Sequence, residues 1–378
     1  MSLGQWTVHA HQSVSYRVAE APGLLAPTDG ALARAARLTP GTRRLVVIDE
    51  RVLALHGDRI HAYFRAREAV PHVLALSGGE SGKELAAVER VVRAADAVGL
   101  DRRDPIVAIG GGVLTDLVGL AASLYRRGTP FVRVPTTLVG MIDAAVGAKT
   151  AVNAHGHKNR LGTYHPAADT LVDRSFLRTL GPRHIRNGVA EIVKMAVIDD
   201  PVLFDLLDAH AETLVDTRMA GPEGGEVMRR AITAMLAHLE PNLWEKDLCR
   251  AVDFGHTFGP ALEMVLQPAL LHGEAVSLDM ALSCAISVDQ GLLSPADAVR
   301  VLRLLERIGL PVRHERCTPV FLAEALAEST RHRDGHQHLP LPAGIGKCVF
   351  AEDLTPDGLA RAVELLDRLL VGAEGAAA

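Results

Sequence analysis

Two histidines and a glutamate in the second half of the chain have side chains suited to bind a divalent metal ion. Glu191 lies in N-G-V-A-E-I-V-K, His256 in D-F-G-H-T-F and His272 in L-H-G-E. Three protein ligands that leave one position open are typical of catalytic zinc sites. Their spacing also fits interior histidines that are satisfied by hydrogen bonds. Both interpretations are open at this point.

Two further ionisable groups have neighbours that favour burial. Lys194 follows Glu191 by three residues and shares its helix face. A solvated surface pair is the usual case, but the apolar neighbours on this face favour a pair that points into the protein. Asp143, in M-I-D-A-A, is a carboxylate among apolar residues and needs a polar partner, of which a bound ligand is one candidate.

A glycine-rich turn provides a possible phosphate site. The apolar run 106–109 is followed by Gly110, Gly111 and Gly112 and then by an amphipathic run to Leu124, which predicts strand, turn and helix. Glycine lets a backbone approach a phosphate, and a helix N-terminus favours an anion. Plain tight packing is the alternative.

Polar and cationic side chains lie in predicted loops around this turn and near the C-terminus. They are Arg127, Lys149, Lys158, Asn159, His332 and Arg333. Such groups suit a phosphorylated small substrate, and a solvated charged surface is the alternative. Asp49, at the end of a predicted strand, could hold ribose hydroxyls or cap a helix.

The elements that carry these residues alternate between predicted strands and helices in the first part of the chain and are predicted helices in the second part. Strands are predicted at 44–48, 72–76, 106–109, 131–134 and 170–172, with helices at 84–98 and up to residue 124. Residues 7–18 also alternate like a strand. Beyond residue 180, helices are predicted at 188–198, 202–216, 226–239, 257–266, 274–289, 295–308 and 357–371, with junctions at 221–225 and 267–268. We therefore predict a Rossmann-like parallel α/β domain, 1–180, and a mostly helical domain, 181–378.

Composition limits the function class. The 378 residues carry a net charge of −5 with mixed signs, which indicates neither nucleic acid nor membrane as a partner. No apolar run approaches the ~18 residues of a membrane span, and no signal peptide is evident. Cys249, Cys284, Cys317 and Cys348 form no C-x-x-C pair, so we expect reduced thiols and a cytoplasmic location.

Together these stretches resemble the dehydroquinate synthase-like superfamily of sugar phosphate cyclases. The resemblance covers residues 49–353 and is carried by G-G-G-V-x-x-D, Y-R-R-G, V-P-T-T-L, D-A-A-V-G-A-K-T, G-H-K-N-R-L-G, N-G-V-A-E-I-V-K, G-H-T-F and H-G-E. It implies an NAD-binding α/β domain, a helical metal-binding domain, an active site between them and a homodimer.

The resemblance also implies a role for single residues. Glu191, His256 and His272 would bind zinc or cobalt. The NAD contacts would be Asp49, Glu80, Lys83, Gly110, Gly111, Gly112, Asp116, Thr136 and Thr137, with Lys158 near cofactor and cleft. Asp143, Lys149 and Lys194 would hold substrate hydroxyls, Asn159 would bind the phosphate, and Arg127 would reach the phosphate in the neighbouring subunit.

Departures from the dehydroquinate synthases indicate the substrate. Those enzymes carry Asn where this chain has Asp253, His where it has Pro260, and Arg where it has Cys249, with Arg250 shifted by one position. Their paired C-terminal lysines are replaced by R-H-R-D-G, in which His332 is the best phosphate candidate. Asp253 would repel a substrate carboxylate but would accept a hydrogen bond from a hydroxymethyl group. In these features the chain resembles the sedoheptulose 7-phosphate cyclases, in particular the 2-epi-5-epi-valiolone synthases of secondary metabolism.

The resemblance implies a carbon–oxygen lyase acting on phosphates. Transient oxidation of sedoheptulose 7-phosphate by NAD, loss of phosphate, re-reduction and aldol closure would give a C7 cyclitol without net redox change. The resemblance does not determine which epimer is formed, so a 2-epi-valiolone synthase is an alternative. A 3-dehydroquinate synthase would need the missing basic residues, and a metal-dependent polyol dehydrogenase would consume NAD stoichiometrically.

Overall fold

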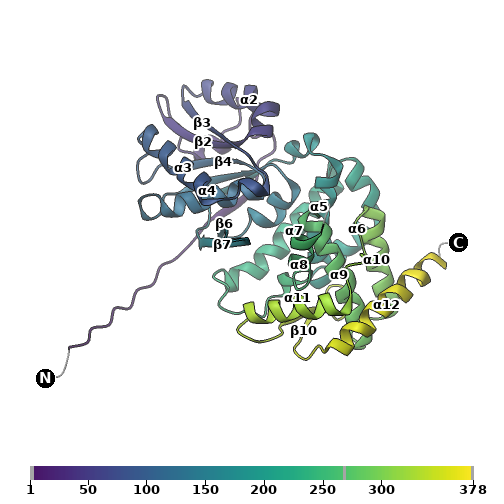
Figure 1. Cartoon of the computed structure of the whole chain (residues 1–378). Helices are drawn as coiled ribbons and strands as arrows, with labels where there is room; N and C mark the ends of the chain where they lie inside the picture. Colours follow the sequence, from purple (N-terminus) through teal and green to yellow (C-terminus); the bar gives the residue numbers. More distant parts are fainter. Residues whose placement is uncertain (1–3, 267–269, 376–378) are drawn as a thin grey trace.

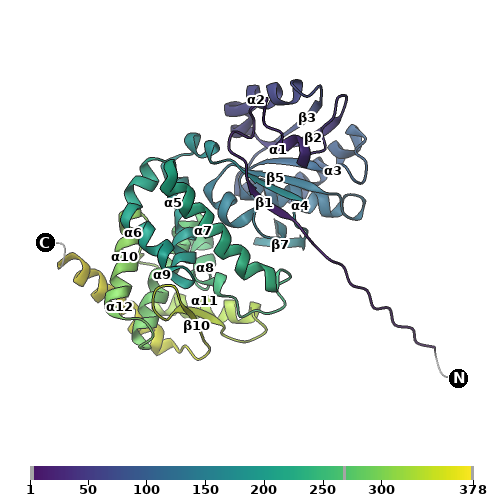
Figure 2. The same cartoon turned by 180° about the vertical axis from the view of Figure 1, so that it is seen from behind.

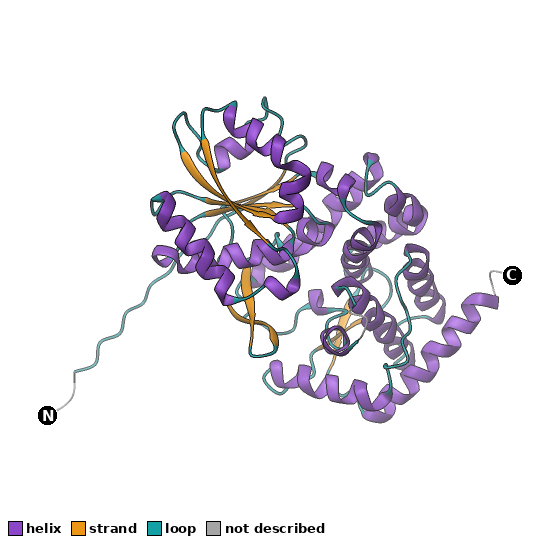
Figure 3. Cartoon of the chain, turned by 45° about the horizontal axis from the view of Figure 1, so that its top comes forward, coloured by secondary structure: helices purple, strands orange, loops and turns teal. Residues whose placement is uncertain are grey.

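A six-stranded parallel sheet forms the first part of the computed structural model, which describes residues 4–266 and 270–375. Its order is β1-β8-β5-β4-β2-β3, and every neighbouring pair is parallel. The strands are β1 (Arg17–Glu20), β2 (Arg43–Asp49), β3 (Val70–Leu76), β4 (Ile106–Gly110), β5 (Phe131–Pro135) and β8 (Asp169–Val172). Figure 3 shows these strands with helices packed beside them. The predicted parallel α/β architecture is confirmed.

Helices cover both faces of this sheet. They are α1 (Ala31–Ala35), α2 (Glu50–Arg65), α3 (Leu85–Val98) and α4 (Gly112–Leu124), and Figures 1 and 2 show them from opposite sides. Within β2, Val46 and Ile48 belong to one buried cluster, whereas Leu45 and Val47 belong to a second cluster with residues of α3 and α4. Since successive strand residues point to opposite faces, a strand buried on both sides is apolar throughout.

The order of the sheet reverses between β2 and β4. The chain continues from β2 outward to β3, and from β4 in the opposite direction to β5. In open α/β sheets, ligands bind at the carboxyl ends of the strands at this switch point. The strands end there at Asp49 and Gly110.

The second part of the chain is mostly helical. It contains α5 (Pro182–Ile198), α6 (Pro201–Asp216), α7 (Gly221–Leu239), α8 (Gly259–Val265), α9 (His272–Asp289), α10 (Pro295–Ile308), α11 (Pro319–His332) and α12 (Pro356–Gly375), with an antiparallel pair, β9 (Leu339–Pro342) and β10 (Cys348–Ala351). Helix α9 is buried over nearly its whole length and packs against α5, α8, α10 and α12. One buried cluster runs from the Val46 face of the sheet into these helices.

A separate antiparallel hairpin lies near both parts (Figure 1). Its strands are β6 (Lys149–Ala154) and β7 (His157–Tyr164), which pair with an irregularity between Val152 and Ala154. The prediction of loops at Lys149, Lys158 and Asn159 is therefore wrong. Strand β7 reads H-K-N-R-L-G-T-Y and is mostly exposed, so no apolar alternation marks it as a strand.

Two other predictions are corrected. Of residues 7–18 only the last two lie in a strand, β1, while residues 4–16 are mostly exposed and pair with no strand, so alternation alone did not produce one. Residues 221–225 open helix α7 instead of separating helices. The glycine at 224 serves close packing, because a Cβ there would lie 2.3 Å from the carbonyl oxygen of Met219. The junction predicted at Gln267 and Pro268 lies outside the described residues.

Short turns complete the fold. Turns of 3₁₀ type span Glu80–Gly82, Tyr125–Arg127, Arg174–Thr179, Glu240–Asn242 and Ala251–Asp253, and a π-helical turn spans Gly140–Ala144. Such π turns are often found at functional sites. Among the helices of the described ranges, none has the length and apolar character needed to cross a lipid bilayer.

Candidate active site

Glu191, His256 and His272 converge at one point, where one donor atom from each lies within 4.8 Å of the others. Glu191 comes from α5, His256 from the loop before α8, and His272 is the first residue of α9. Oε1 of Glu191 lies 3.1 Å from Nε2 of His272, and the two Nε2 atoms lie 3.3 Å apart. Three residues distant in sequence thus present donors to a common centre.

Hydrogen bonds orient both imidazole rings toward this centre. Nδ1 of His256 donates to the carbonyl oxygen of Phe254 at 3.0 Å, and Nδ1 of His272 donates to Oε2 of Glu263 at 3.3 Å. A ring that carries its proton on Nδ1 has its Nε2 lone pair free for a metal. Both rings are therefore held as a metal-binding histidine requires, with Nε2 facing the centre.

Glu191 is fully buried, and in the described parts of the chain neither of its oxygens accepts a hydrogen bond of ordinary geometry. Burial opposes its ionisation, but the charges of Lys194 and the two histidines hold the pKa of Glu191 well below its usual range. Burial and Lys194 lower the pKa of His256 to about 4, whereas the neighbouring carboxylates of Glu191 and Glu263 overcome burial and raise the pKa of His272 to about 10. A buried carboxylate and two imidazoles form a donor set that fits a divalent metal.

Lys194 lies beside this centre, as the face it shares with Glu191 predicts. Its side chain is 2% exposed, and its Nζ lies 2.6 Å from Oε2 of Glu191. Burial lowers the pKa of Lys194, but the nearby charges of Glu191 and Asp143 outweigh this effect and raise it. Asp143 belongs to the π-helical turn and is half-buried. Lys194 is therefore a protonated donor next to the point where Glu191, His256 and His272 meet.

Asp253 is bound by two arginines. Nη2 of Arg250 lies 2.7 Å from both of its carboxylate oxygens, and Nη2 of Arg333 lies 3.3 Å from Oδ2. Arg250 also pairs with Glu245, which in turn lies 2.7 Å from Nζ of Lys149. Both oxygens of Asp253 thus face guanidinium groups, and its role toward a hydroxymethyl group stays a prediction.

His332 lies away from this network. Its side chain is 64% exposed, and its Nε2 is 3.9 Å from the carboxylate of Glu328 on the same helix. The neighbouring residue, Arg333, points inward instead and also donates to the carbonyl oxygen of His338. The structure therefore brings Arg333, and not the predicted His332, to the network around Asp253.

The predicted cofactor residues meet at the carboxyl ends of β2, β3 and β4. Oδ1 of Asp49 caps helix α2 by accepting from the N–H groups of Arg51 and Val52, so the capping alternative applies to this oxygen. Its Oδ2 faces Gly78, where a Cβ would lie 1.7 Å away. At Gly110, a Cβ would lie 2.5 Å from the side chain of Leu114. Side chains approach the backbone closely at both positions, so the alternative of tight packing applies to Gly110, which is buried just before helix α4.

Lys83 connects this edge to the hairpin. Its buried ammonium donates to Asp116 at 2.9 Å and to Oδ1 of Asn159 at 2.6 Å. Glu80 accepts from Asn153 of β6 at 2.8 Å. Four residues with predicted cofactor or phosphate roles, Glu80, Lys83, Asp116 and Asn159, thus belong to one polar network.

The remaining predicted residues flank this network. The N–H of Thr136 donates to the carbonyl oxygen of Gly110, and Oγ1 of Thr137 accepts from Gly140. Gly111 approaches Thr137, and Gly112 opens helix α4. Arg127 is exposed in its 3₁₀ turn, where its φ is 62°.

Two of the predicted cations, Lys158 and Lys149, have acidic partners that the sequence analysis did not identify. Glu263 accepts from Lys158 at 2.5 Å and from His272, and Glu245 accepts from Lys149, Arg250 and Tyr164. Glu263 follows His256 by seven residues in G-H-T-F-G-P-A-L-E. Because metal-binding histidines commonly donate to a carboxylate, a search for one nearby could have found it.

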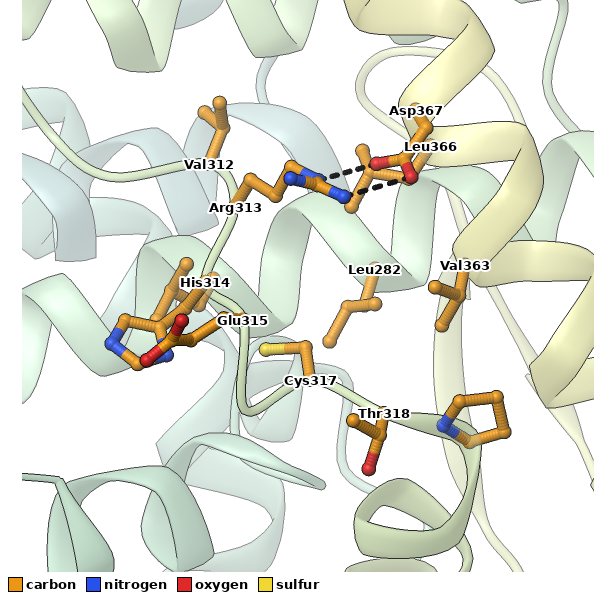
Figure 4. Close-up of a pocket in the computed structure, with 12 residues that line it drawn as sticks. Leu282, Val312, Arg313, His314, Glu315, Cys317, Thr318, Val363, Leu366 and Asp367 are labelled. Atoms are coloured by element: carbon orange, nitrogen blue, oxygen red, sulfur yellow. Dashed lines mark hydrogen bonds and ion pairs between the residues drawn. The ribbon is translucent and has the colours of Figure 1, made fainter.

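A cavity of about 210 Å³ lies elsewhere in the helical part (Figure 4). It is lined by α9, α12 and residues 312–319, and the ion pair of Arg313 with Asp367 lies at its edge, with distances of 2.5 and 2.9 Å. None of the predicted site residues lines it. We assign it no part in the chemistry.

Comparisons with known proteins agree with this geometry. The model of the 3-dehydroquinate synthase N-terminal region matches residues 73–187, and that of the 3-dehydroquinate synthase C-terminal region matches residues 188–332. A 2-epi-5-epi-valiolone synthase from Streptomyces hygroscopicus subsp. jinggangensis (strain 5008) is 53% identical over 360 residues, which cover 93% of this chain and 86% of the relative.

Solved structures show the same fold. ValA, a 2-epi-5-epi-valiolone synthase from Streptomyces hygroscopicus subsp. jinggangensis 5008 with NAD⁺ and Zn²⁺ bound, is 51% identical, with a TM-score of 0.91 over 96% of this chain and 99% of ValA. A 2-deoxy-scyllo-inosose synthase complexed with carbaglucose-6-phosphate, NAD⁺ and Co²⁺ shares the fold at 24% identity, with a TM-score of 0.77 over 93% and 96% of the two chains. The chain therefore belongs to the dehydroquinate synthase-like superfamily of sugar phosphate cyclases.

Proposed function

We propose that this chain converts sedoheptulose 7-phosphate to 2-epi-5-epi-valiolone with release of phosphate, and so acts as a carbon–oxygen lyase. The observation that carries the proposal is the convergence of Glu191, His256 and His272 beside Lys194, in a chain 53% identical to a 2-epi-5-epi-valiolone synthase. We further propose that it acts in the cytoplasm, since its four cysteines are free thiols.

NAD and a divalent metal, zinc or cobalt, fit the residues present. Glu191, His256 and His272 would hold the metal, and the backbone around Gly110, together with Asp49 and the network of Lys83, would hold NAD. The ValA structure, which contains NAD⁺ and Zn²⁺, supports both assignments. When bound, NAD accepts and later returns a hydride, and the metal polarises the hydroxyl that is oxidised.

The side chains of this chain would then orient the substrate. Lys194 is buried and protonated, so it would donate a hydrogen bond to a substrate oxygen beside the metal, and the half-buried Asp143 would accept one from a hydroxyl. Lys149, whose side chain is 62% exposed, would face the substrate from the hairpin.

The phosphate group of the substrate needs cationic and amide donors at the end of the site away from the metal. We propose Asn159 for this role, together with Arg127 contributed by the second subunit of a homodimer. The exposed position of Arg127 supports its assignment to a partner's site. Because His332 is exposed beside Glu328, Arg333 replaces it in this proposal as the inward-facing cation of this region.

The decisive assay is incubation of the purified protein with sedoheptulose 7-phosphate, NAD and Zn²⁺. We expect phosphate release without accumulation of NADH, because the hydride returns to the substrate, and NMR should identify the product as 2-epi-5-epi-valiolone. Accumulating NADH without phosphate would instead indicate a polyol dehydrogenase. Another epimer would indicate a 2-epi-valiolone synthase, and turnover of the seven-carbon heptulosonate phosphate alone would indicate a 3-dehydroquinate synthase.

A further inference from the structure

The carboxylate of Glu263 has two different partners, one at the metal ligands and one on the hairpin. Its Oε2 accepts from Nδ1 of His272 at 3.3 Å, and its Oε1 accepts from Nζ of Lys158 at 2.5 Å. The Glu263 side chain is 14% exposed and belongs to α8, whereas Lys158 belongs to β7, 105 residues earlier in the chain. One side chain thus joins two elements of different parts of the fold.

The first contact fixes how His272 presents itself. With its proton on Nδ1 and donated to Glu263, the ring points Nε2 toward Glu191 and His256. Removing such an outer partner of a metal-binding histidine typically lowers metal affinity by about 10–100-fold, because ring orientation and tautomer are no longer fixed.

The second contact fixes the hairpin near its tip. Strand β7 is mostly exposed, so little buried apolar surface holds it in place. At the base of the hairpin, Lys149 and Tyr164 contact Glu245. Near the tip, Lys158 contacts Glu263, and the adjacent Asn159 accepts a hydrogen bond from Lys83, which lies at the carboxyl ends of the sheet strands.

We propose that Glu263 is a positioning residue that couples metal binding to the position of the hairpin, residues 149–164. A metal bound to Nε2 of His272 fixes the ring, the ring fixes the carboxylate of Glu263, and the carboxylate fixes Lys158 together with the neighbouring Asn159. The inference rests on the proposed function only in its use of His272 as a metal ligand. It does not depend on which sugar phosphate is the substrate.

Three variants separate the two contacts. Glu263→Ala removes both. Glu263→Gln keeps a carbonyl oxygen that can accept from His272 but replaces the acceptor of Lys158 with an amide N–H₂ donor. Lys158→Met keeps the contact with His272 and removes the one with the hairpin. Glu212→Gln, which removes a paired carboxylate at the exposed ion pair with Arg307, is the matched control.

Each full-length variant is measured for Zn²⁺ affinity by competition with a chromophoric chelator and for amide hydrogen exchange of residues 149–164 with and without Zn²⁺. We expect Glu263→Ala to lose about 10–100-fold in Zn²⁺ affinity, and Glu263→Gln and Lys158→Met to stay within about threefold of the wild type. Zn²⁺ should slow exchange in β7 of the wild type and the Glu212→Gln control, and should not do so in the other three variants.

Two results would overturn the proposal: wild-type Zn²⁺ affinity in Glu263→Ala, or a Zn²⁺-dependent protection of β7 that survives in Glu263→Gln and Lys158→Met. If Glu263→Ala does not fold, judged by circular dichroism, the other two variants still decide the hairpin contact. Neither measurement uses substrate. If the Zn²⁺ affinities and the hydrogen exchange come out as expected and the cyclase assay fails, that failure counts against the proposed function alone.

Discussion

Nη2 of Arg333 lies 3.3 Å from Oδ2 of Asp253, so the end of α11 contacts the turn that precedes His256. Arg250 holds the same carboxylate through Nε and Nη2. Burial opposes ionisation of this carboxyl group, but the two guanidinium groups outweigh burial and lower the pKa of Asp253. Asp253 therefore stays ionised and neutralises two arginines close to the proposed substrate site.

Asp253→Asn should impair turnover by releasing these two cations. Arg250 keeps Glu245 as a partner, but the short contacts of Arg333 and Arg250 with a shared anion are lost. We expect kcat/KM for sedoheptulose 7-phosphate to fall by at least about tenfold, equivalent to ~1.4 kcal/mol, with a near-normal circular dichroism spectrum. Glu328→Gln, at the exposed ion pair with His332, is the control and should leave kcat/KM unchanged. Equal values for both variants would remove Asp253 from the site.

Removal of the metal should abolish turnover while the fold remains. Dialysis against a chelator is expected to lower phosphate release by at least about 10³-fold, because a Lewis acid contributes several kcal/mol, and added Zn²⁺ should restore it. His256→Ala should likewise be inactive and contain less metal by elemental analysis. Full activity of this variant with an unchanged metal content would exclude His256 as a ligand.

The four cysteines should react slowly with thiol reagents. Burial raises the pKa of Cys284 and Cys348 to about 12 and that of Cys317 to about 11, and it also raises the pKa of Cys249. A raised pKa lowers the thiolate fraction at pH 8, and the thiolate is the reactive form. We expect iodoacetamide to modify the native protein at least about tenfold more slowly than the urea-unfolded chain. Rapid loss of activity at pH 8 would contradict this expectation.

Arg127 can be tested by mixing two inactive proteins. If Arg127 acts in the partner's site, a dimer of one Arg127→Ala subunit and one His256→Ala subunit contains one complete site. Random exchange of equal amounts should restore about a quarter of wild-type activity, whereas either variant alone should show little. Light scattering should give the mass of a dimer. No recovery after demonstrated subunit exchange would place Arg127 in its own subunit's site or outside any site.

Local pattern was sufficient for five of the six strands of the sheet and for the three residues that meet at one point, Glu191, His256 and His272. Strands such as β4 are buried on both faces and therefore read as continuous apolar runs, and the G-H-T-F and H-G-E motifs placed His256 and His272 directly. The face shared by Glu191 and Lys194 was predictable because three residues nearly complete one helical turn. These features depend on neighbours within a few residues.

Contacts between distant segments were not predictable in this way. Local spacing does not show which acidic group meets Lys158 or Lys149, because Glu263 and Glu245 lie in other elements. The choice between His332 and Arg333 depended on which way the end of α11 faces, and adjacent helical residues point about 100° apart. The hairpin itself was missed because β7 buries too little apolar surface to show alternation.

The hairpin precedes the helical part in the chain, yet two of its lysines end on acidic partners of that later part, Glu245 and Glu263. Recombination between related genes near residue 180 would combine a hairpin from one parent with acidic partners from the other. A hybrid would retain its sheet and helices, but its lysines would meet whatever residues the second parent supplies at these two positions. Chimeras within this superfamily should therefore be joined so that each lysine and its acidic partner are inherited together.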